Sequence, residues 1–373
     1  MSMDTFEFRE RIVFQLRNLF EAFGYSRYKM NKFEEYDLYA ENKDFLLSDS
    51  VLTFTDVGGK LMALKPDVTL SIVKNSADDL PAFQKLYYNE NVYRVDRGGN
   101  SFREVNQVGL ECIGKVDDLC ILEILTLAAK SLKTISSDSI LVVSHLGILS
   151  DILSSVGISG SKKDLAFGYI SQKNLHELNA CLRSCNVSEN CILLVNRLLT
   201  SNGYPYSVLT EIRNLIGNIA DTQMVDRLIS YFSALQGSGL EDMFRFDFSE
   251  VDDVRYYNGI VFKGYVNGLP DSVLSGGQYD NLMRKMHRKS DAVGFAVYID
   301  RLEQLEPRNS RYDVDVILLY DDTTSAQTVM EYASGFRAQG YRVVTQQQKP
   351  KSVLCGKLIR LHDGEVEILE NNA

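Results

Sequence analysis

The spacing of apolar side chains predicts where the helices of this chain lie. Residues 5–23 place apolar side chains three or four positions apart and end at Gly24, which is the pattern of an amphipathic helix with a glycine stop. A strand-poor stretch with helical spacing covers about 161–235, and we interpret it as an inserted helical module. The same spacing predicts shorter helices at 119–132, 280–286 and 294–305.

Runs of β-branched and aromatic residues predict the strands. The segment 25–40 is expected to be extended, and 51–69 is expected to form a hairpin that turns at 56–60. Further strands are predicted at 85–95, 102–114, 139–147, 244–248, 256–266 and 271–275. Together these elements predict an α+β fold, an antiparallel sheet with flanking helices.

A Pro-containing polar segment at 307–310 is the best candidate for a linker between domains. It separates a predicted core of residues 1–306 from a small C-terminal α/β domain of residues 311–373. The elements predicted in the small domain are a strand at 313–320, a helix at 323–340, a strand at 341–346 and a hairpin around 362–364.

Length, composition and charge narrow the class of protein. The 373 residues suffice for two domains and an insert, and 45% hydrophobic and 24% charged residues are ordinary for a globular protein. A formal net charge of −10 without any block of Lys and Arg lowers the expectation of a nucleic-acid partner. No apolar run approaches the roughly 18–20 residues of a membrane span. The N-terminus has no signal-peptide h-region, so we expect a cytoplasmic protein without membrane contact.

The cysteines give little reason to expect a metal site. The sequence has six cysteines and none forms a CxxC pair. Cys181, Cys185 and Cys191 lie near His176, but their spacing matches no common zinc pattern. We interpret them as buried free thiols and expect no bound metal.

Several ordered segments carry a resemblance to one known family. They read FGYSRYKMNKFEEYDLY, NVYRVDRGGNSFREVNQVGLECIG, YYNGIVFKGY, SGGQYDNLM and AVGFAVYIDRL, and their order and spacing resemble the catalytic core of histidyl-tRNA synthetases. The resemblance covers roughly residues 5–305. It implies the class II aminoacyl-tRNA synthetase fold, in which a six- or seven-stranded antiparallel sheet is flanked by helices, normally in a homodimer.

Two kinds of protein share this core. The synthetase activates histidine with ATP and charges tRNA. The other is the regulatory subunit of the short-form ATP phosphoribosyltransferase, which governs the first step of histidine biosynthesis, keeps a histidine site and does not charge tRNA. Resemblance to this second kind implies L-histidine as a ligand, a separate catalytic subunit as the partner, and a hetero-octamer built on dimers of the core.

Histidine offers an ammonium, a carboxylate and an imidazole, so its pocket needs acceptors, donors and a polar clamp. In LKPDVT, the resemblance places Asp67 and Thr69 at the amino group. Gln107 and Glu111 lie four residues apart on a predicted strand and therefore share one face. The resemblance places Gln107 at the amino or carboxylate end and Glu111 on the imidazole. Singly, each is explained as well by a half-solvated strand, but together they fill every role that histidine requires.

Two tyrosines and an arginine complete the expected histidine pocket. Tyr257 matches the family tyrosine that closes on the ring, and Tyr256 is its neighbour in the sequence. Arg255 shares a face with Tyr257 if the strand starts near Val254, and it would then reach the ligand carboxylate. The alternative for Arg255 is an exposed arginine at a strand end.

The residues just before this strand argue against adenylate chemistry. Forming an aminoacyl-adenylate brings a carboxylate and a phosphate together, and fixed arginines stabilise the charge that develops. Histidyl-tRNA synthetases have an arginine–glycine pair here, whereas this chain has Asp252 and Asp253. A carboxylate would repel the phosphate by up to roughly 4 kcal/mol at about 4 Å and an effective dielectric of about 20. We interpret Asp252 as a lost catalytic position and expect no catalytic residue.

Part of the family's nucleotide site is retained. The resemblance assigns Arg94, Arg103 and Arg301 to it, although Arg94 is equally open to an ion pair with Asp96 or Glu111. Other positions depart from the family pattern: Ser101 and Gln278 replace arginines, Tyr298 replaces a glycine and Asn31 replaces a proline.

The C-terminal segment 313–373 resembles the start of a synthetase anticodon-binding domain but lacks room for its second helix and later strands. A surface that reads tRNA is therefore not expected. The primary hypothesis is a non-catalytic, histidine-sensing regulatory subunit that uses no cofactor. The alternatives are a divergent histidyl-tRNA synthetase that activates histidine with ATP and, less favoured, a synthetase-like protein for another small amine or carboxylate.

Overall fold

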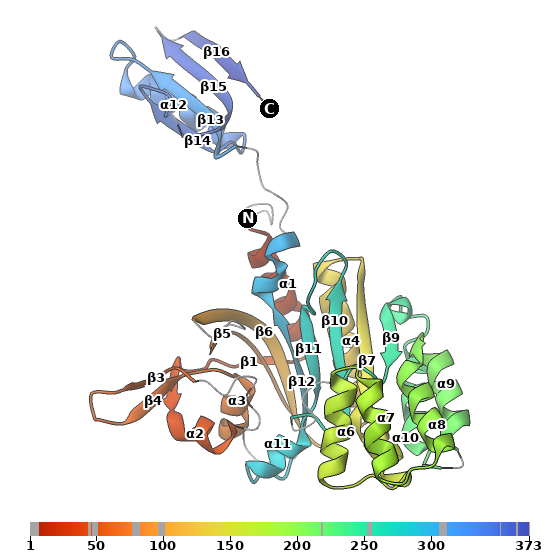
Figure 1. Ribbon diagram of the computed structural model, residues 1–373. Coiled ribbons are helices and arrows are strands. Elements are labelled where there is room, and N and C mark those ends of the chain that lie inside the picture. Colours follow the sequence, from red (N-terminus) through yellow and green to blue (C-terminus); the bar gives the residue numbers. More distant parts are fainter. Residues whose placement is uncertain are drawn as a thin grey trace. The chain divides into compact units, whose positions relative to one another are not determined.

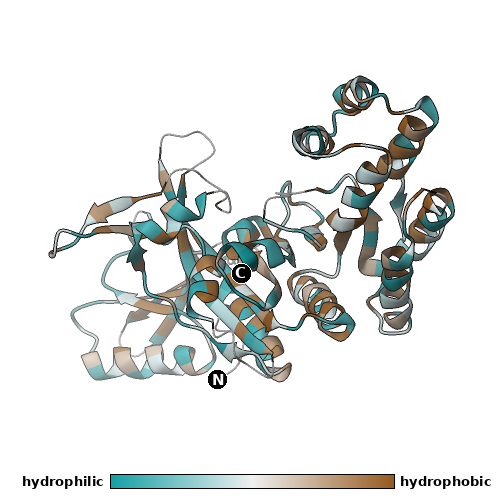
Figure 2. Cartoon of the chain, turned by 90° about the horizontal axis from the view of Figure 1, so that it is seen from below, coloured by the Kyte–Doolittle hydropathy of each residue, from teal (hydrophilic) through white to brown (hydrophobic). Residues whose placement is uncertain are grey.

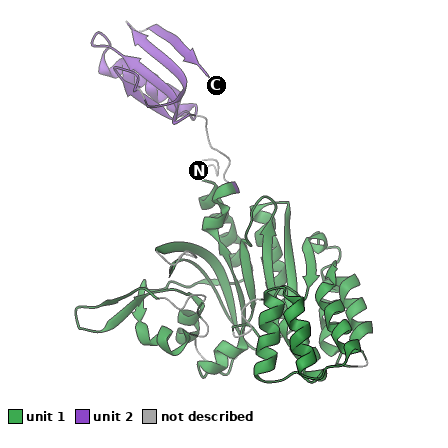
Figure 3. Ribbon diagram, in the orientation of Figure 1, with its two compact units in different colours: residues 1–304 green, residues 305–373 purple. Residues whose placement is uncertain are grey.

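The computed structural model describes residues 7–43, 46, 51–76, 83–95, 101–217, 219–251, 256–305, 312–350, 352–362 and 365–372. The chain forms two compact units, residues 1–304 and residues 305–373 (Figure 3). In the described ranges, no helix is both long and apolar enough to cross a membrane.

A large mixed sheet is the centre of the first unit (Figure 1). The described part of the chain contributes nine strands to it, in the order β1 (Ser26–Arg27), β5 (Gln84–Val95), β6 (Phe102–Gly114), β12 (Asp291–Tyr298), β11 (Leu274–Gln278), β10 (Ile260–Val266), β7 (Ser139–His145), β9 (Phe244–Asp247) and β8 (Asn202–Gly203). The six strands from β5 to β7 are antiparallel, as the resemblance implies. The outer pairs β1–β5 and β7–β9 are parallel, so the sheet is wider than expected and mixed at its edges.

Two helices, α1 (Phe8–Ala22) and α4 (Asp118–Ile135), pack on one face of this sheet. In α1 the buried side chains Ile12, Leu16 and Phe20 recur every four residues, which puts them on one stripe. The Phe20 ring lies 5.9 Å from that of Phe295 on β12. Gly24 adopts φ +82°, which an L side chain rarely adopts, and ends the helix region as predicted. Because the helices cover this face, the opposite face of the sheet is where a site can form.

A small three-stranded sheet precedes β5, built from β2 (Phe33–Glu35), β4 (Leu61–Leu64) and β3 (Thr53–Thr55). Its predicted hairpin turn is confirmed, because the Asp56 carboxylate accepts the backbone N–H groups of Gly58 and Lys60, each at 2.8 Å. Two expectations here are wrong. The segment 25–40 is not wholly extended, because α2 (Tyr36–Glu41) begins within it, and Thr69 starts helix α3 (Thr69–Asn75) instead of ending the hairpin.

The helical insert is formed as predicted, apart from the two residues of β8. Its helices are α6 (Ser161–Ser171), α7 (Leu175–Ser184), α8 (Glu189–Thr200), α9 (Pro205–Ile216) and α10 (Gln223–Ala234), preceded by α5 (Leu146–Ser155), which was not predicted. Asn174 and Ser188 accept backbone N–H groups as N-caps of α7 and α8. Figure 2 shows hydrophobic and hydrophilic residues side by side along these helices. Cys181 is buried as expected, whereas Cys185 and Cys191 are only partly buried.

The predicted helix at 294–305 is wrong. Residues 291–298 form β12, and only Ile299–Leu305 are helical, as a 3₁₀ helix (η4). The strand is central and buried on both faces, so its sequence is a continuous apolar run whose period cannot distinguish a strand from a helix. Likewise, β10 begins at Ile260 and not at Tyr256, and β11 lies about three residues later than the predicted strand. The helix predicted at 280–286 is α11 (Asp280–Lys285).

The second unit contains the predicted strand, helix, strand and hairpin. Its sheet has the order β14 (Val343–Gln346), β13 (Val314–Tyr320), β15 (Cys355–His362) and β16 (Glu365–Asn371) in the described residues, and α12 (Ala326–Ala338) packs on it. The helix buries Val329 and Ala333 against apolar side chains of β13 and β15. In the described part of this unit, α12 is the one helix that covers the sheet.

Candidate functional site

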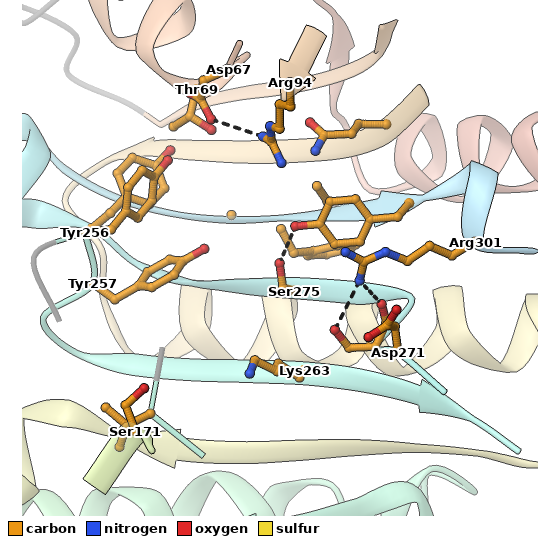
Figure 4. Close-up of a pocket in the computed structure, with 18 of the residues that line it drawn as sticks. Asp67, Thr69, Arg94, Ser171, Tyr256, Tyr257, Lys263, Asp271, Ser275 and Arg301 are labelled. Atoms are coloured by element: carbon orange, nitrogen blue, oxygen red, sulfur yellow. Dashed lines mark hydrogen bonds and ion pairs between the residues drawn. The ribbon is translucent and has the colours of Figure 1, made fainter. Parts of the chain in front are cut away.

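A cavity of about 1040 Å³ lies on the face of the large sheet that α1 and α4 leave free. The predicted site residues that the structure describes all line it: Asp67, Thr69, Arg94, Arg103, Gln107, Glu111, Tyr256, Tyr257 and Arg301. Figure 4 labels six of them: Asp67, Thr69, Arg94, Tyr256, Tyr257 and Arg301. Asp252 and Arg255, the predicted lost catalytic position and the predicted carboxylate ligand, lie outside the described residues. Residues that are up to 234 positions apart (67 to 301) therefore meet in one place.

The Glu111 carboxylate is an almost fully enclosed polar group of the cavity. It is 2% exposed and accepts hydrogen bonds from the Thr69 hydroxyl at 2.7 Å and the Tyr279 hydroxyl at 2.5 Å. Burial raises the pKa of Glu111 to about 8, while these two donors act in the opposite direction and Asp67 adds to the rise. Glu111 is therefore positioned to exchange a proton with a ligand near neutral pH.

A glycine on the next strand makes room for this carboxylate. Gly294 of β12 pairs with Glu111 of β6. A Cβ at position 294 would lie 1.8 Å from Glu111 Oε2 and 2.4 Å from the Leu110 carbonyl oxygen, closer than atoms can approach. The absence of a side chain at Gly294 is therefore a condition for the observed position of Glu111.

Asp67 is a second buried carboxylate, at the N-terminal approach to α3. Its Oδ1 accepts the Leu70 backbone N–H at 2.9 Å, and its Oδ2 lies 3.8 Å from Arg94 Nη2 (Figure 4). Burial raises the pKa of Asp67, and the Arg94 charge opposes that rise. Arg94 also donates from Nε to the Pro66 carbonyl at 3.0 Å, so its ion-pair partner is Asp67 and not Glu111 as one interpretation had it.

Gln107 lies between the buried carboxyl groups of Glu111 and Asp67 and the end of the cavity that contains Arg301. It shares a face of β6 with Glu111, as the four-residue spacing predicted, and it is only 4% exposed. Among the described residues its amide has no hydrogen-bond partner, although buried amides usually have one. A ligand with a carboxylate or an ammonium would satisfy this amide.

Tyr256 and Tyr257 form an aromatic edge of the cavity, in the turn that leads into β10. Their ring centroids lie 4.7 Å apart, and Tyr256 lies 5.8 Å from the Tyr279 ring. Gly277 leaves the space for this edge, because a Cβ there would be 2.8 Å from the Tyr257 ring. The rings therefore flank the chamber next to Glu111.

The opposite end of the cavity is cationic. Arg301 stacks over the Tyr298 ring, with 4.1 Å between the guanidinium carbon and the ring centroid. Lys263 of β10 forms a 2.7 Å ion pair with Glu250, which also accepts the Tyr265 hydroxyl at 3.2 Å. Lys263 and Tyr265 were not predicted as site residues. A lysine in the otherwise apolar strand of YYNGIVFKGY is the signal that could have identified Lys263.

Comparison with known proteins identifies the family of this chain. The family model for histidyl-tRNA synthetase matches residues 2–302. The chain belongs to the histidyl-tRNA synthetase family.

Individual relatives refine this assignment. A curated ATP phosphoribosyltransferase regulatory subunit from Oceanobacillus iheyensis is 25% identical over 297 residues, 79% of this chain and 73% of the relative. The crystal structure of an ATP phosphoribosyltransferase regulatory subunit/histidyl-tRNA synthetase from Bacillus halodurans is similar at a TM-score of 0.75 and 26% identity, over 91% of this chain and 88% of that chain. The ATP phosphoribosyl transferase (HisG:HisZ) complex from Thermotoga maritima is similar in fold at a TM-score of 0.62 and 19% identity, over 79% and 98%. The class II synthetase fold predicted from the motifs is confirmed.

Within this family member, Gln278 replaces the usual arginine and takes a different partner. Its amide donates to Asp280 Oδ2 at 2.7 Å, and the Asn258 amide donates to the same atom at 3.0 Å. Gln278 therefore ties the end of β11 to the start of α11 instead of placing a positive charge in the cavity.

The helical insert supplies one wall of the site, which sequence reasoning missed. Phe167, Gly168 and Ser171 of α6 line the cavity, and Ser171 lies across it from Thr69 in Figure 4. Nothing in the local sequence of α6 indicates this role, because it depends on how the insert packs against the sheet. A ligand in the cavity would therefore be in reach of the insert as well as the sheet.

Proposed function

We propose that this chain is the regulatory, non-catalytic subunit of an ATP phosphoribosyltransferase and that its cavity binds L-histidine. The shared name of the relatives supports the regulatory role. The observation that carries the ligand proposal is the buried Glu111 carboxyl, held by Thr69 and Tyr279 beside Asp67.

Each group of histidine has a complementary group in the proposed site. The Asp67 carboxylate and the Thr69 oxygen suit the ammonium, because both are acceptors at one end of the chamber. The Gln107 amide suits the ligand carboxylate, for which it has a donor. Glu111 suits the imidazole, and Tyr257 covers its ring. An apolar amino acid has no side-chain group that could hydrogen-bond to Glu111.

Loss of adenylate chemistry is the second part of the proposal. Asp252 and Asp253 directly follow Val251, which lines the cavity. A carboxylate near a reacting phosphate raises the energy of the transition state instead of lowering it. The proposed role therefore uses no catalytic residue, no cofactor and no tRNA.

A divergent histidyl-tRNA synthetase is the second candidate. It is favoured by Arg94, Arg103 and Arg301, which line the same cavity as the histidine-binding groups. Histidine-dependent ATP–pyrophosphate exchange by the purified chain separates the two candidates. Exchange at a rate typical of synthetases supports the second candidate, and no exchange above background supports the first.

Control of a partner requires that histidine bind two states of the assembly with different affinity. We propose that this chain acts in the cytoplasm with a separate catalytic chain, as homodimers within a hetero-octamer. The similar chain in the Thermotoga maritima complex supports such a partner. Helix α6 of the helical insert lines the cavity. Histidine bound in the cavity would therefore alter the surface of the first unit through this insert.

The experiment that tests this function uses the complex of this chain with a short-form catalytic chain. Phosphoribosyl transfer is measured with increasing L-histidine for the wild-type chain and for Glu111→Gln. The wild-type complex should be inhibited, and the Glu111→Gln complex should need about a hundredfold more histidine, as expected when a charged hydrogen-bond partner is lost. Glu104→Gln, an exposed change on the same strand, is the matched control and should be inhibited like the wild type. Equal inhibition of the Glu111→Gln complex would exclude this site as the sensor.

A further inference from the structure

The side chains of β12 that form the floor of the cavity increase in size along the strand. Gly294, Ala296 and Tyr298 alternate on the same face of the strand and all line the cavity. Gly294 lies opposite Glu111, and Tyr298 lies opposite Gln107. Over Gly294 the space is taken by the Glu111 carboxylate, whereas at the other end an aromatic ring rises from the floor.

The Tyr298 side chain is fixed in place on two sides. Its hydroxyl lies 2.8 Å from Ser275 Oγ, and its ring lies under the Arg301 guanidinium. Arg301 is itself oriented, because Nη1 donates to the Ser272 carbonyl and lies 3.4 Å from the Ser272 hydroxyl. Only 7% of Tyr298 is exposed, so the ring is packed against the guanidinium and is not a mobile surface group.

A guanidinium face is a surface on which a planar aromatic base stacks. Arg103 and Lys263 also line the cavity, but so does the Asp271 carboxylate beside Arg301, and Lys263 is paired with Glu250. The volume of about 1040 Å³ is large enough for a nucleoside, so lack of room does not exclude one. One face of the Arg301 guanidinium is already occupied, because the Tyr298 ring covers it from within the protein.

We propose that Tyr298 is a specificity-determining residue that occupies one stacking face of the Arg301 guanidinium and thereby excludes the base of adenine nucleosides and nucleotides from that face. An incoming base must displace the ring and break both the Arg301 stack and the Ser275 hydrogen bond. The inference goes beyond histidine sensing, because it concerns the opposite end of the cavity and holds whether or not histidine binds at Glu111.

Equilibrium dialysis with radiolabelled adenosine, and separately with ATP, tests this role. The wild-type chain should bind neither probe measurably at millimolar concentration. Tyr298→Gly should bind adenosine about ten- to a hundredfold more tightly than the detection limit that the wild type does not reach, the usual range for one base stacked on a side chain. Tyr298→Phe is the matched control. It keeps the aromatic ring on Arg301 and should bind as little adenosine as the wild type. Adenosine binding reports on base stacking alone, whereas ATP binding also depends on contacts between its phosphates and the cationic side chains of the cavity.

Circular dichroism and thermal unfolding show whether each variant folds. If Tyr298→Gly does not fold, Tyr298→Leu keeps buried apolar volume and should show a smaller gain in adenosine binding, because an aliphatic group competes less well for the guanidinium face. Measurable adenosine binding by the wild-type chain, or a folded open variant that gains none, would overturn the proposal. Neither outcome bears on histidine binding at Glu111, which is measured separately.

Discussion

The Thr69 hydroxyl donates a 2.7 Å hydrogen bond to Glu111, which lies 42 residues further along the chain on a different element. With the Tyr279 hydroxyl on the other carboxylate oxygen, this bond holds Glu111 in a position where it is only 2% exposed. The donors satisfy the carboxyl but do not offset its burial, so its pKa stays at about 8. An imidazole with an ordinary pKa of about 6.5 would share one proton with such a group.

Histidine affinity should show a plateau between about pH 6.5 and pH 8. In this window the empty site holds one proton on Glu111 and free imidazole holds none, so the bound pair needs no proton from solvent. Above about pH 8 the site must take up a proton, and below about pH 6.5 it must release one, so Kd should rise about tenfold per pH unit on each side. Titration calorimetry across this pH range measures the Kd for histidine.

The control for this pH profile is Glu111→Gln, which cannot titrate. Its residual binding should lose the rise in Kd that begins near pH 8, leaving only the changes due to the ligand's own groups. A wild-type profile that changes monotonically from pH 5 to pH 9 would contradict the shared proton.

The stability of the empty protein should fall as pH rises from about 6.5 to about 8. The pKa of Glu111 is higher in the folded state than in the unfolded chain, so the folded protein binds the extra proton and loses that advantage toward pH 8. His145 has the opposite effect, since burial lowers its pKa to about 4, but that effect is complete by about pH 6.5. The fall should be about 1–2 kcal/mol and should be reduced in Glu111→Gln, as measured by guanidinium unfolding at both pH values.

Gly294→Ala should remove histidine binding and lower the free energy of unfolding by more than about 2 kcal/mol, because the added Cβ would meet Glu111 Oε2 and the Leu110 carbonyl. Gly335→Ala is the matched control. Gly335 lies in α12 with no atom within 4 Å of the added Cβ, and alanine there should stabilise by about 0.5–1 kcal/mol. Thermal unfolding and calorimetry compare the two. Unchanged binding in Gly294→Ala would mean that Glu111 is not placed as described.

Lys65→Met should destabilise the core by about 3–5 kcal/mol, because it leaves Glu90 without the cation that neutralises it. The Lys65 side chain is only 2% exposed and that of Glu90 is 15% exposed. Lys60→Met breaks the pair with Glu35, whose side chains are 55% and 47% exposed, and should cost less than about 1 kcal/mol. Similar losses in both variants, measured by denaturant unfolding, would argue against a structural role for the buried pair.

The elements that the sequence predicted well are those with one apolar face. Helix α1 shows a clear stripe at Ile12, Leu16 and Phe20, so its period is decisive. Strand β12 was predicted as a helix because it is covered on both faces and has no alternation. Central position alone does not prevent prediction, because the neighbouring strand β6 was predicted with its exact bounds.

The site residues were predicted from ordered family motifs. Cavity residues that belong to no such motif were therefore not predicted. Thr69, Gln107 and Glu111 belong to such motifs and line one cavity. Phe167 and Ser171 do not, because they reach the cavity only through the packing of the insert on the sheet. Long-range packing of this kind leaves no periodic signal in a single sequence, so the α6 wall could not have been predicted.

Titration calorimetry of the isolated chain with L-histidine at pH 7 measures whether the cavity is a histidine site. We expect saturable binding at one site per chain, no comparable binding of L-phenylalanine or L-glutamine, and about a hundredfold loss in Glu111→Gln but not in Glu104→Gln. No heat of binding from the folded wild-type chain at millimolar histidine, or equal affinity in Glu111→Gln, would contradict this expectation.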